Sequence, residues 1–257
     1  MGNNDNKVYF IGAGPGDPGL LTLTGAACLR KADWVYAPTP YEEAFADLLQ
    51  GKAVAVPFAY RFEQLLELLG QQLATGHVAF LVPGDLTFYS PFQALVDALG
   101  EHAEVVPGVG TVNAASAYLK KTLDLPGVCN RAIIASPRTL GDAKGNPDLS
   151  DLAAPGVTLL IYMNNLPLVQ LVAKLRRGFA ANVPIVLLHR LGLPGQEIVQ
   201  GTLDDICAKV GARDYFNLTT ATRRPSLTLV IAGEALVAEV DGAWWNERQE
   251  TVWKDLG

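Results

Sequence analysis

Short apolar runs alternate with amphipathic segments along this chain, and the alternation restricts the possible folds more than any other feature. Residues 62–75 (FEQLLELLGQQLAT), for example, have the spacing of a helix with one apolar face. The apolar runs of the first half, each with the length of a buried strand, are 8–13, 34–37, 53–58, 78–85 and 103–108. Strands separated by helices of this length predict a mostly parallel sheet that helices cover on both faces.

The second half continues with further strand candidates. Buried strands are expected over 131–136, 158–163, 184–189 and 226–233. A helix is expected over 166–178, where Gly178 ends it. The chain is therefore expected to be an α/β protein of two α/β domains with mostly parallel or mixed sheets. We place the domains at 1–112 and 113–240, followed by a terminal tail over 241–257.

Composition argues against several classes of protein. The chain has 257 residues, of which 49% are hydrophobic and 18% charged, as in a compact globular protein. Its formal net charge is −6 and it has no lysine- or arginine-rich stripe, so a nucleic-acid surface is not expected. It also lacks a run of about 18 apolar residues, so we expect no membrane span.

The cysteines give no sign of a disulfide framework or a metal site. Cys28, Cys129 and Cys207 are far apart and form no Cys-x-x-Cys pair. We expect no bound metal and a reducing, cytoplasmic setting, which the lack of an apolar run of signal-peptide length near the start also favours.

The first apolar run ends in the glycine-rich sequence IGAGPGDPG (11–19), which suggests a dinucleotide loop at first reading. Gly12 and Gly14 fit the pattern Gly-x-Gly-x-x-Gly, but Asp17 stands where the third glycine belongs. Pro15 and Pro18 supply no backbone amides, which are the groups a phosphate cradle needs. Pyrophosphate binding is therefore disfavoured, and Asp17 is also a candidate cap for a helix that begins near Pro18.

Two further turns share this character. Residues 81–91 (LVPGDLTFYSP) and 105–115 (VVPGVGTVNAA) both close a strand candidate with Pro-Gly. Ligands bind to parallel sheets at the carboxyl ends of strands, and small residues let a backbone approach a ligand closely. The three turns together predict a pocket at that edge of the sheet.

These motifs resemble those of a known family, the tetrapyrrole (corrin and porphyrin) methylases. The resemblance runs over residues 7–236 and is carried by the opening motif, by VPGDLTFYSP and by VVPGVGTVNAASAY. It implies two α/β domains, with S-adenosyl-L-methionine as the methyl donor in the cleft between them, S-adenosyl-L-homocysteine as the product, and a homodimer. The residues that it places at the donor are Pro15, Pro83, Gly84, Asp85, Phe88, Gly110, Thr111, Met163 and Leu191.

The resemblance also implies an anionic tetrapyrrole as substrate. Its carboxylates would need cationic partners, preferably arginine, and the candidates are Arg131, Arg138, Arg190, Arg223 and Arg224, each also readable as a solvated surface charge. Asp17 would face the substrate and is the candidate catalytic base, with helix capping as the alternative. Core packing is the alternative role of Met163. His189 is the one histidine that merits a test.

The implied reaction is methylation of a ring carbon in cobalamin (corrin) biosynthesis, with carbon 11 of precorrin-4 or cobalt-precorrin-4 as the first candidate. Uroporphyrinogen III or another precorrin is the alternative substrate. Two positions depart from the family pattern, because Leu86 stands in place of proline and Ser90 in place of glycine. Leu86 leaves a non-catalytic ligand-binding protein open, and the glycine loop leaves a nicotinamide or flavin oxidoreductase open.

The tail carries three of the four tryptophans. We expect it to form a terminal helix that docks on the body of the protein or on a partner subunit.

Overall fold

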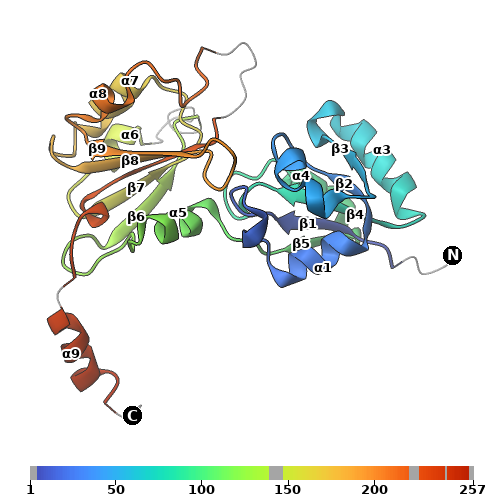
Figure 1. Ribbon diagram of the computed structural model, residues 1–257, viewed down its shortest axis with the longest axis horizontal. Coiled ribbons are helices and arrows are strands. Elements are labelled where there is room, and N and C mark those ends of the chain that lie inside the picture. Colours follow the sequence, from blue (N-terminus) through green and yellow to red (C-terminus); the bar gives the residue numbers. More distant parts are fainter. Residues whose placement is uncertain (1–4, 139–146, 220–225, 241, 255–257) are drawn as a thin grey trace. The chain divides into compact units, whose positions relative to one another are not determined.

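The chain divides into two compact units in the computed structural model (Figure 1). The structure describes residues 5–138, 147–219, 226–240 and 242–254. The amino-terminal unit consists of Met1–Tyr118 and, from later in the chain, His189–Glu197. The carboxyl-terminal unit consists of Leu119–Leu188 and Ile198–Gly257. The domain bounds expected from the sequence, 1–112 and 113–240, stay a prediction.

The amino-terminal unit is built on a sheet of five parallel strands in the order β3-β2-β4-β1-β5. These strands are β1 (Val8–Gly12), β2 (Ala32–Tyr36), β3 (Ala53–Ala55), β4 (His77–Val82) and β5 (Ala103–Val106). Because all five run in the same direction, their carboxyl ends lie at one edge of the sheet. The strands β4, β1 and β5, which carry the three glycine-bearing turns, are neighbours in it.

Helices cover both faces of this sheet. They are α1 (Leu23–Lys31), α2 (Tyr41–Ala44), α3 (Phe62–Leu73) and α4 (Gln93–Leu99), with short 3-10 helices at Pro18–Leu20, Ala46–Leu49, Pro57–Ala59 and Gly100–His102. A further helix, α5 (Thr111–Leu119), follows β5 in the chain. Figure 1 shows α1 and α3 on opposite sides of the sheet. The parallel sheet with two covered faces that the sequence predicts is confirmed.

The side chains of β1 show how the sequence produces this layering. Tyr9 and Ile11 pack in one core cluster with Leu29 of α1, whereas Phe10 packs in another with Leu69 of α3. Successive strand residues point to opposite faces, so a strand buried on both faces must be apolar throughout. In α3 the buried leucines recur every fourth residue, and full burial of one such side chain stabilises the fold by roughly 1.5–3 kcal/mol.

The carboxyl-terminal sheet is mixed and has the order β6-β7-β10-β8-β9. Its strands are β6 (Arg131–Ala135), β7 (Val157–Ile161), β8 (Pro184–His189), β9 (Glu197–Thr202) and β10 (Thr228–Ala232). β6 pairs with β7 in parallel, whereas β10 pairs with β7 antiparallel. The remaining helices are α6 (Leu149–Leu152), α7 (Leu168–Leu175), α8 (Ile206–Val210), α9 (Gly242–Thr251) and a 3-10 helix at Glu234–Leu236. The expected α/β class with mostly parallel or mixed sheets is confirmed.

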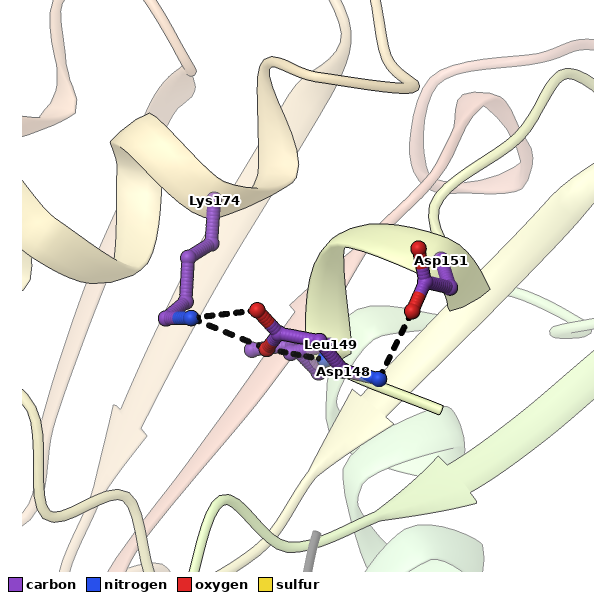
Figure 2. A network of polar contacts seen from close by, with 4 residues as sticks. All are labelled: Asp148, Leu149, Asp151 and Lys174. Carbon is purple, nitrogen blue, oxygen red and sulfur yellow. Dashed lines mark hydrogen bonds and ion pairs between the residues drawn. The ribbon is translucent and has the colours of Figure 1, made fainter. Parts of the chain in front are cut away.

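A polar network joins the start of α6 to α7 (Figure 2). Asp148 caps α6 by accepting a hydrogen bond from the Leu149 backbone, and its own amide donates to Asp151 at 2.8 Å. Lys174 of α7 donates to both carboxylate oxygens of Asp148, at 2.9 and 2.6 Å. The hydrogen bond from Lys174 is the largest influence on Asp148 and lowers the pKa of this carboxyl group. The network therefore fixes the position of one short helix against a longer one.

The terminal helix α9 is exposed along its length. None of its residues is buried. The rings of Trp244 and Trp245 each pack against that of Trp253, just beyond the helix, with centroids 6.5 and 5.2 Å apart. The guanidinium of Arg248 lies over the Trp244 ring. The helix is thus formed as expected, while its docking on the body or on a partner stays a prediction.

None of the helices in the described residues has the length and apolar character needed to cross a membrane. In the same part of the chain, His, Cys, Asp and Glu side chains form no group that could hold a metal ion.

Candidate active site

The first two glycine-bearing turns are joined directly by their backbones. Where β1 and β4 end, the amide of Ala13 donates to the Val82 carbonyl at 2.9 Å. Gly14 and Gly84 then exchange two hydrogen bonds, of 3.0 and 2.7 Å, in a short antiparallel bridge. Both glycines have the left-handed backbone that side-chain-bearing residues rarely adopt, with φ of 70° and 69°. Pro15 and Pro83, which adjoin these glycines in the chain, therefore lie at one junction.

The third turn approaches the first so closely that only glycine fits. A Cβ atom on Gly12 would lie 2.5 Å from the Gly108 nitrogen, a distance that real Cβ atoms essentially never show. The third turn is also held by Thr22, the cap of α1, whose hydroxyl donates to the Pro107 carbonyl at 3.3 Å. The carboxyl ends of β1 and β5 thus meet backbone to backbone.

The second and third turns also meet. A Cβ atom on Gly84 would lie 3.2 Å from the Thr111 hydroxyl, and one on Gly110 would lie 3.6 Å from an Asp85 carboxylate oxygen. Asp85 accepts hydrogen bonds from the backbone and the hydroxyl of Thr87, at 3.1 and 2.9 Å. The structure therefore brings together the residues that the sequence predicted on three separate turns. Phe88 on the same turn is 48% exposed.

Asp17 occupies the position of a cap. One of its carboxylate oxygens accepts the Gly19 amide at 2.8 Å at the start of the 3-10 helix Pro18–Leu20. The capping alternative is thus present in the structure, whereas a catalytic role for Asp17 is left untested by this geometry. The side chain is partly exposed.

A segment from much later in the chain packs against the first turn. A Cβ atom on Gly192 would lie 2.9 Å from the Asp17 nitrogen, and one on Gly16 would collide with the Leu193 side chain. Leu191 and Leu193 are both buried. The sequence pointed to Leu191 but not to Leu193, whose only signal was a Gly-Leu-Pro-Gly turn directly after a strand.

Tyr41 is a further residue that sequence reasoning missed. Its side chain is 2% exposed, and its hydroxyl donates to the Gly14 carbonyl at 2.8 Å. The sequence YAPTPYEEAF (36–45) gives no sign of this contact. Periodic patterns indicate helices and strands within one segment, whereas this hydrogen bond joins two separate segments.

The other predicted residues lie on other segments of the chain. Met163 lies in the carboxyl-terminal unit, is partly buried, and has a left-handed backbone with φ of 47°. Arg131 and Arg190 donate to backbone carbonyl groups, those of Pro155 and Pro194 respectively. Arg138 is exposed. Arg223 and Arg224 lie outside the described residues.

His189 stands at the end of β8. Burial is the main influence that lowers its pKa, and the positive charge of Arg190 lowers it further. The imidazole is therefore held toward its neutral form, in which one ring nitrogen accepts hydrogen bonds.

Comparisons with known proteins agree with this arrangement. The family model described as Tetrapyrrole (Corrin/Porphyrin) Methylases matches residues 7–207. A protein of Pseudomonas aeruginosa named precorrin-4 C(11)-methyltransferase is 35% identical, over 90% of this chain and 91% of that protein. One of Methanocaldococcus jannaschii, named cobalt-precorrin-4 C(11)-methyltransferase, is 30% identical over 81% of this chain and 83% of that protein.

Solved structures show the same fold. A cobalt precorrin-4 methyltransferase aligns with a TM-score of 0.76 at 24% identity, covering 93% of this chain and 98% of its own. The uroporphyrin-III C-methyl transferase of Thermus thermophilus, complexed with S-adenyl homocysteine, aligns with a TM-score of 0.66 at 28% identity. That alignment covers 90% of this chain and 99% of the other.

Proposed function

Because the chain belongs to the tetrapyrrole (corrin/porphyrin) methylase family, we propose that it methylates a ring carbon of an anionic tetrapyrrole, with S-adenosyl-L-methionine as methyl donor. The observation that carries this proposal is the meeting of three glycine-bearing turns at the carboxyl edge of the parallel sheet. Its product from the donor is S-adenosyl-L-homocysteine, the kind of compound named in the Thermus thermophilus complex.

The preferred substrate is precorrin-4 or cobalt-precorrin-4, methylated at carbon 11 in cobalamin (corrin) biosynthesis. The two relatives with at least 30% identity described above carry those names, and they cover most of this chain. A second candidate is uroporphyrinogen III, which the likeness to the Thermus thermophilus enzyme favours.

The donor site is proposed at the residues that the family resemblance indicates: Pro15, Pro83, Gly84, Asp85, Phe88, Gly110, Thr111, Met163 and Leu191. The turns of the amino-terminal unit suit such a ligand, because their glycines let three backbone segments meet at the carboxyl edge of the sheet, where parallel sheets bind ligands. Asp85 can also accept hydrogen bonds from the methyl donor. A carboxylate can accept about four hydrogen bonds, and the contacts of Asp85 with Thr87 account for two. Asp85 can therefore accept from an ammonium group or from ribose hydroxyls.

Alignment is the main task of these residues in the reaction. When bound, the donor supplies a methyl group that its positively charged sulfur already activates for displacement. The turns hold the methyl group and the attacking ring carbon in line and keep water out. Holding two reacting groups in this geometry accelerates the reaction. Asp17 is proposed as the base that takes a proton from the substrate, and the arginines as partners for the substrate carboxylates.

We further propose a cytoplasmic homodimer. The three cysteines are free, which suits a reducing compartment, and the exposed tryptophans of α9 would suit an interface between subunits. Mass photometry of the purified protein tests the dimer, and a single species at the mass of one chain would contradict it.

The proposed activity is tested with purified protein, isotope-labelled S-adenosyl-L-methionine and a panel of tetrapyrroles. We expect precorrin-4 or its cobalt form to gain the mass of one labelled methyl group, and nuclear magnetic resonance to place that group on carbon 11. Methylation of uroporphyrinogen III alone would favour the second candidate. Calorimetric binding of NADH, without binding of S-adenosylhomocysteine, would instead indicate an oxidoreductase.

A further inference from the structure

A buried tyrosine reaches the junction of the first two turns from outside them. Tyr41 begins the short helix α2, after the end of β2. Its ring stacks on that of Phe45, with centroids 5.8 Å apart, inside the core cluster on the α1 side of the sheet. Only its hydroxyl group makes a polar contact with the turns.

That hydroxyl donates a hydrogen bond to the Gly14 carbonyl oxygen, which also links the two turns. The Gly14 carbonyl oxygen accepts the Tyr41 hydroxyl at 2.8 Å and the Gly84 amide at 2.7 Å. A carbonyl oxygen has two lone pairs, so these two donors satisfy it fully. The backbone of Gly84 and a side chain from a third segment thus hold the same carbonyl oxygen of the Gly14–Gly84 bridge.

The hydroxyl is also fixed as a donor. Burial raises the pKa of Tyr41 well above its ordinary value, and the nearby Gly84 backbone amide offsets only part of this rise. The group therefore keeps its proton at every pH at which the protein would work. A buried hydroxyl costs free energy unless it is paired, so its pairing here stabilises one arrangement of the turns.

We propose that Tyr41 is a positioning residue for the methyl donor, because its hydroxyl locks the Gly14–Gly84 bridge from which the flanking residues Pro15 and Asp85 face the ligand. This inference rests on the proposed function of the turns. It assigns a role in donor binding to a side chain that does not itself line the donor site.

A simple packing role makes a different prediction. If Tyr41 only fills the core, phenylalanine would keep the ring and its stacking on Phe45, and the affinity for donor would not change. If the hydroxyl positions the turns, Tyr41→Phe would weaken donor binding even where the protein is fully folded.

The chain offers a matched control. Tyr36 on β2 is also fully buried, at 1% exposure, and its hydroxyl donates to Gln72 at 3.1 Å, on the other face of the sheet from Tyr41. Tyr36→Phe removes one hydrogen bond of a buried tyrosine without touching the three turns.

The experiment measures the dissociation constant of S-adenosylhomocysteine by calorimetry at 25 °C for the wild type, Tyr41→Phe and Tyr36→Phe. We expect Tyr41→Phe to bind about tenfold more weakly, the factor that corresponds to about 1.4 kcal/mol, and Tyr36→Phe to bind as the wild type does. Equal affinity of all three proteins would overturn the inference alone. Failure of the wild type to bind would overturn the proposed function, and the inference with it.

Amide hydrogen exchange gives a second measurement that needs no ligand. In Tyr41→Phe, peptides that contain the Gly84 amide should exchange faster than in the wild type, and those of α3 should be unchanged. Unchanged exchange at Gly84 would count against Tyr41 as a positioning residue whatever the calorimetry shows.

Discussion

Gly12 and Gly108 show at the scale of single residues why this edge of the sheet requires glycine. Their backbones touch, and a methyl group on either would enter the backbone of the other. Gly108→Ala should therefore lower the free energy of unfolding by about 1–3 kcal/mol, the usual cost of forcing extra atoms into a packed site. Urea denaturation measures this change, and binding of S-adenosylhomocysteine should weaken in the same variant.

Gly70 in α3 is the matched control for that substitution. A Cβ atom there would meet nothing within 4 Å. Alanine is the better helix former, so Gly70→Ala should raise the free energy of unfolding by about 0.5–1 kcal/mol. Equal effects of the two substitutions would mean that the close approach at Gly108 does not govern its stability.

One substitution, Asp17→Asn, distinguishes the two candidate roles of Asp17, helix capping and base catalysis. The side-chain oxygen of asparagine can accept the Gly19 amide as the carboxylate does, but asparagine cannot take up a proton as a base. If Asp17 is the base, Asp17→Asn should lower kcat by about a hundredfold or more and leave the melting temperature nearly unchanged. An unchanged kcat would leave capping as the sole role of this residue.

Lys174 and Asp148 act at the scale of elements, since they connect α7 to the cap of α6 (Figure 2). The two side chains are 33% and 42% exposed, so solvent screens the pair. Lys174→Met should lower the free energy of unfolding by about 0.2–1 kcal/mol, as measured by urea denaturation. Arg176→Met is the control, because the Arg176–Asp204 pair is longer, at 3.4 Å, and more exposed.

The same pair should depend on pH in a defined direction. The folded pKa of Asp148 is lowered, chiefly by the Lys174 hydrogen bond, from an ordinary value near 4. Its stabilising contribution is therefore complete above the unfolded pKa and is lost as pH falls through the folded one. The difference between wild type and Lys174→Met should be constant above about pH 5 and shrink below about pH 4. A difference that grew toward acid pH would contradict this assignment.

Elements differ in how far the sequence could predict them. The apolar residues 8–11 predicted β1 because a strand buried on both faces leaves no polar position. The antiparallel direction of β10 could not be read in the same way, since an apolar run has no direction. The motifs placed Pro15, Gly84 and Gly110 on turns at one edge. The contact of Tyr41 with Gly14 escaped prediction, because tertiary packing alone creates it.

Leu193 is best considered at the scale of the whole molecule, because it completes the amino-terminal unit from a distant part of the chain. Its side chain is 4% exposed and lies against Gly16. Leu193→Ala should lower the free energy of unfolding by about 2–5 kcal/mol, through lost burial and the cavity that remains. Urea denaturation checks this value.

Leu23→Ala is its control. Leu23 is 91% exposed at the start of α1, so its truncation should change stability by less than about 0.5 kcal/mol. A loss at Leu193 no larger than that at Leu23 would mean that the returning segment contributes little to the unit.

The two-part composition of the amino-terminal unit also sets an order of events during synthesis. The first turn is among the earliest parts made, but Gly192 and Leu193 cover it only after most of the chain has emerged. At about 5–20 residues per second, translation takes on the order of ten seconds or more to reach residue 192, and the first turn stays uncovered for that time. A ribosome stalled before residue 189 would therefore hold a nascent chain whose parallel sheet can form but whose glycine turn is still uncovered.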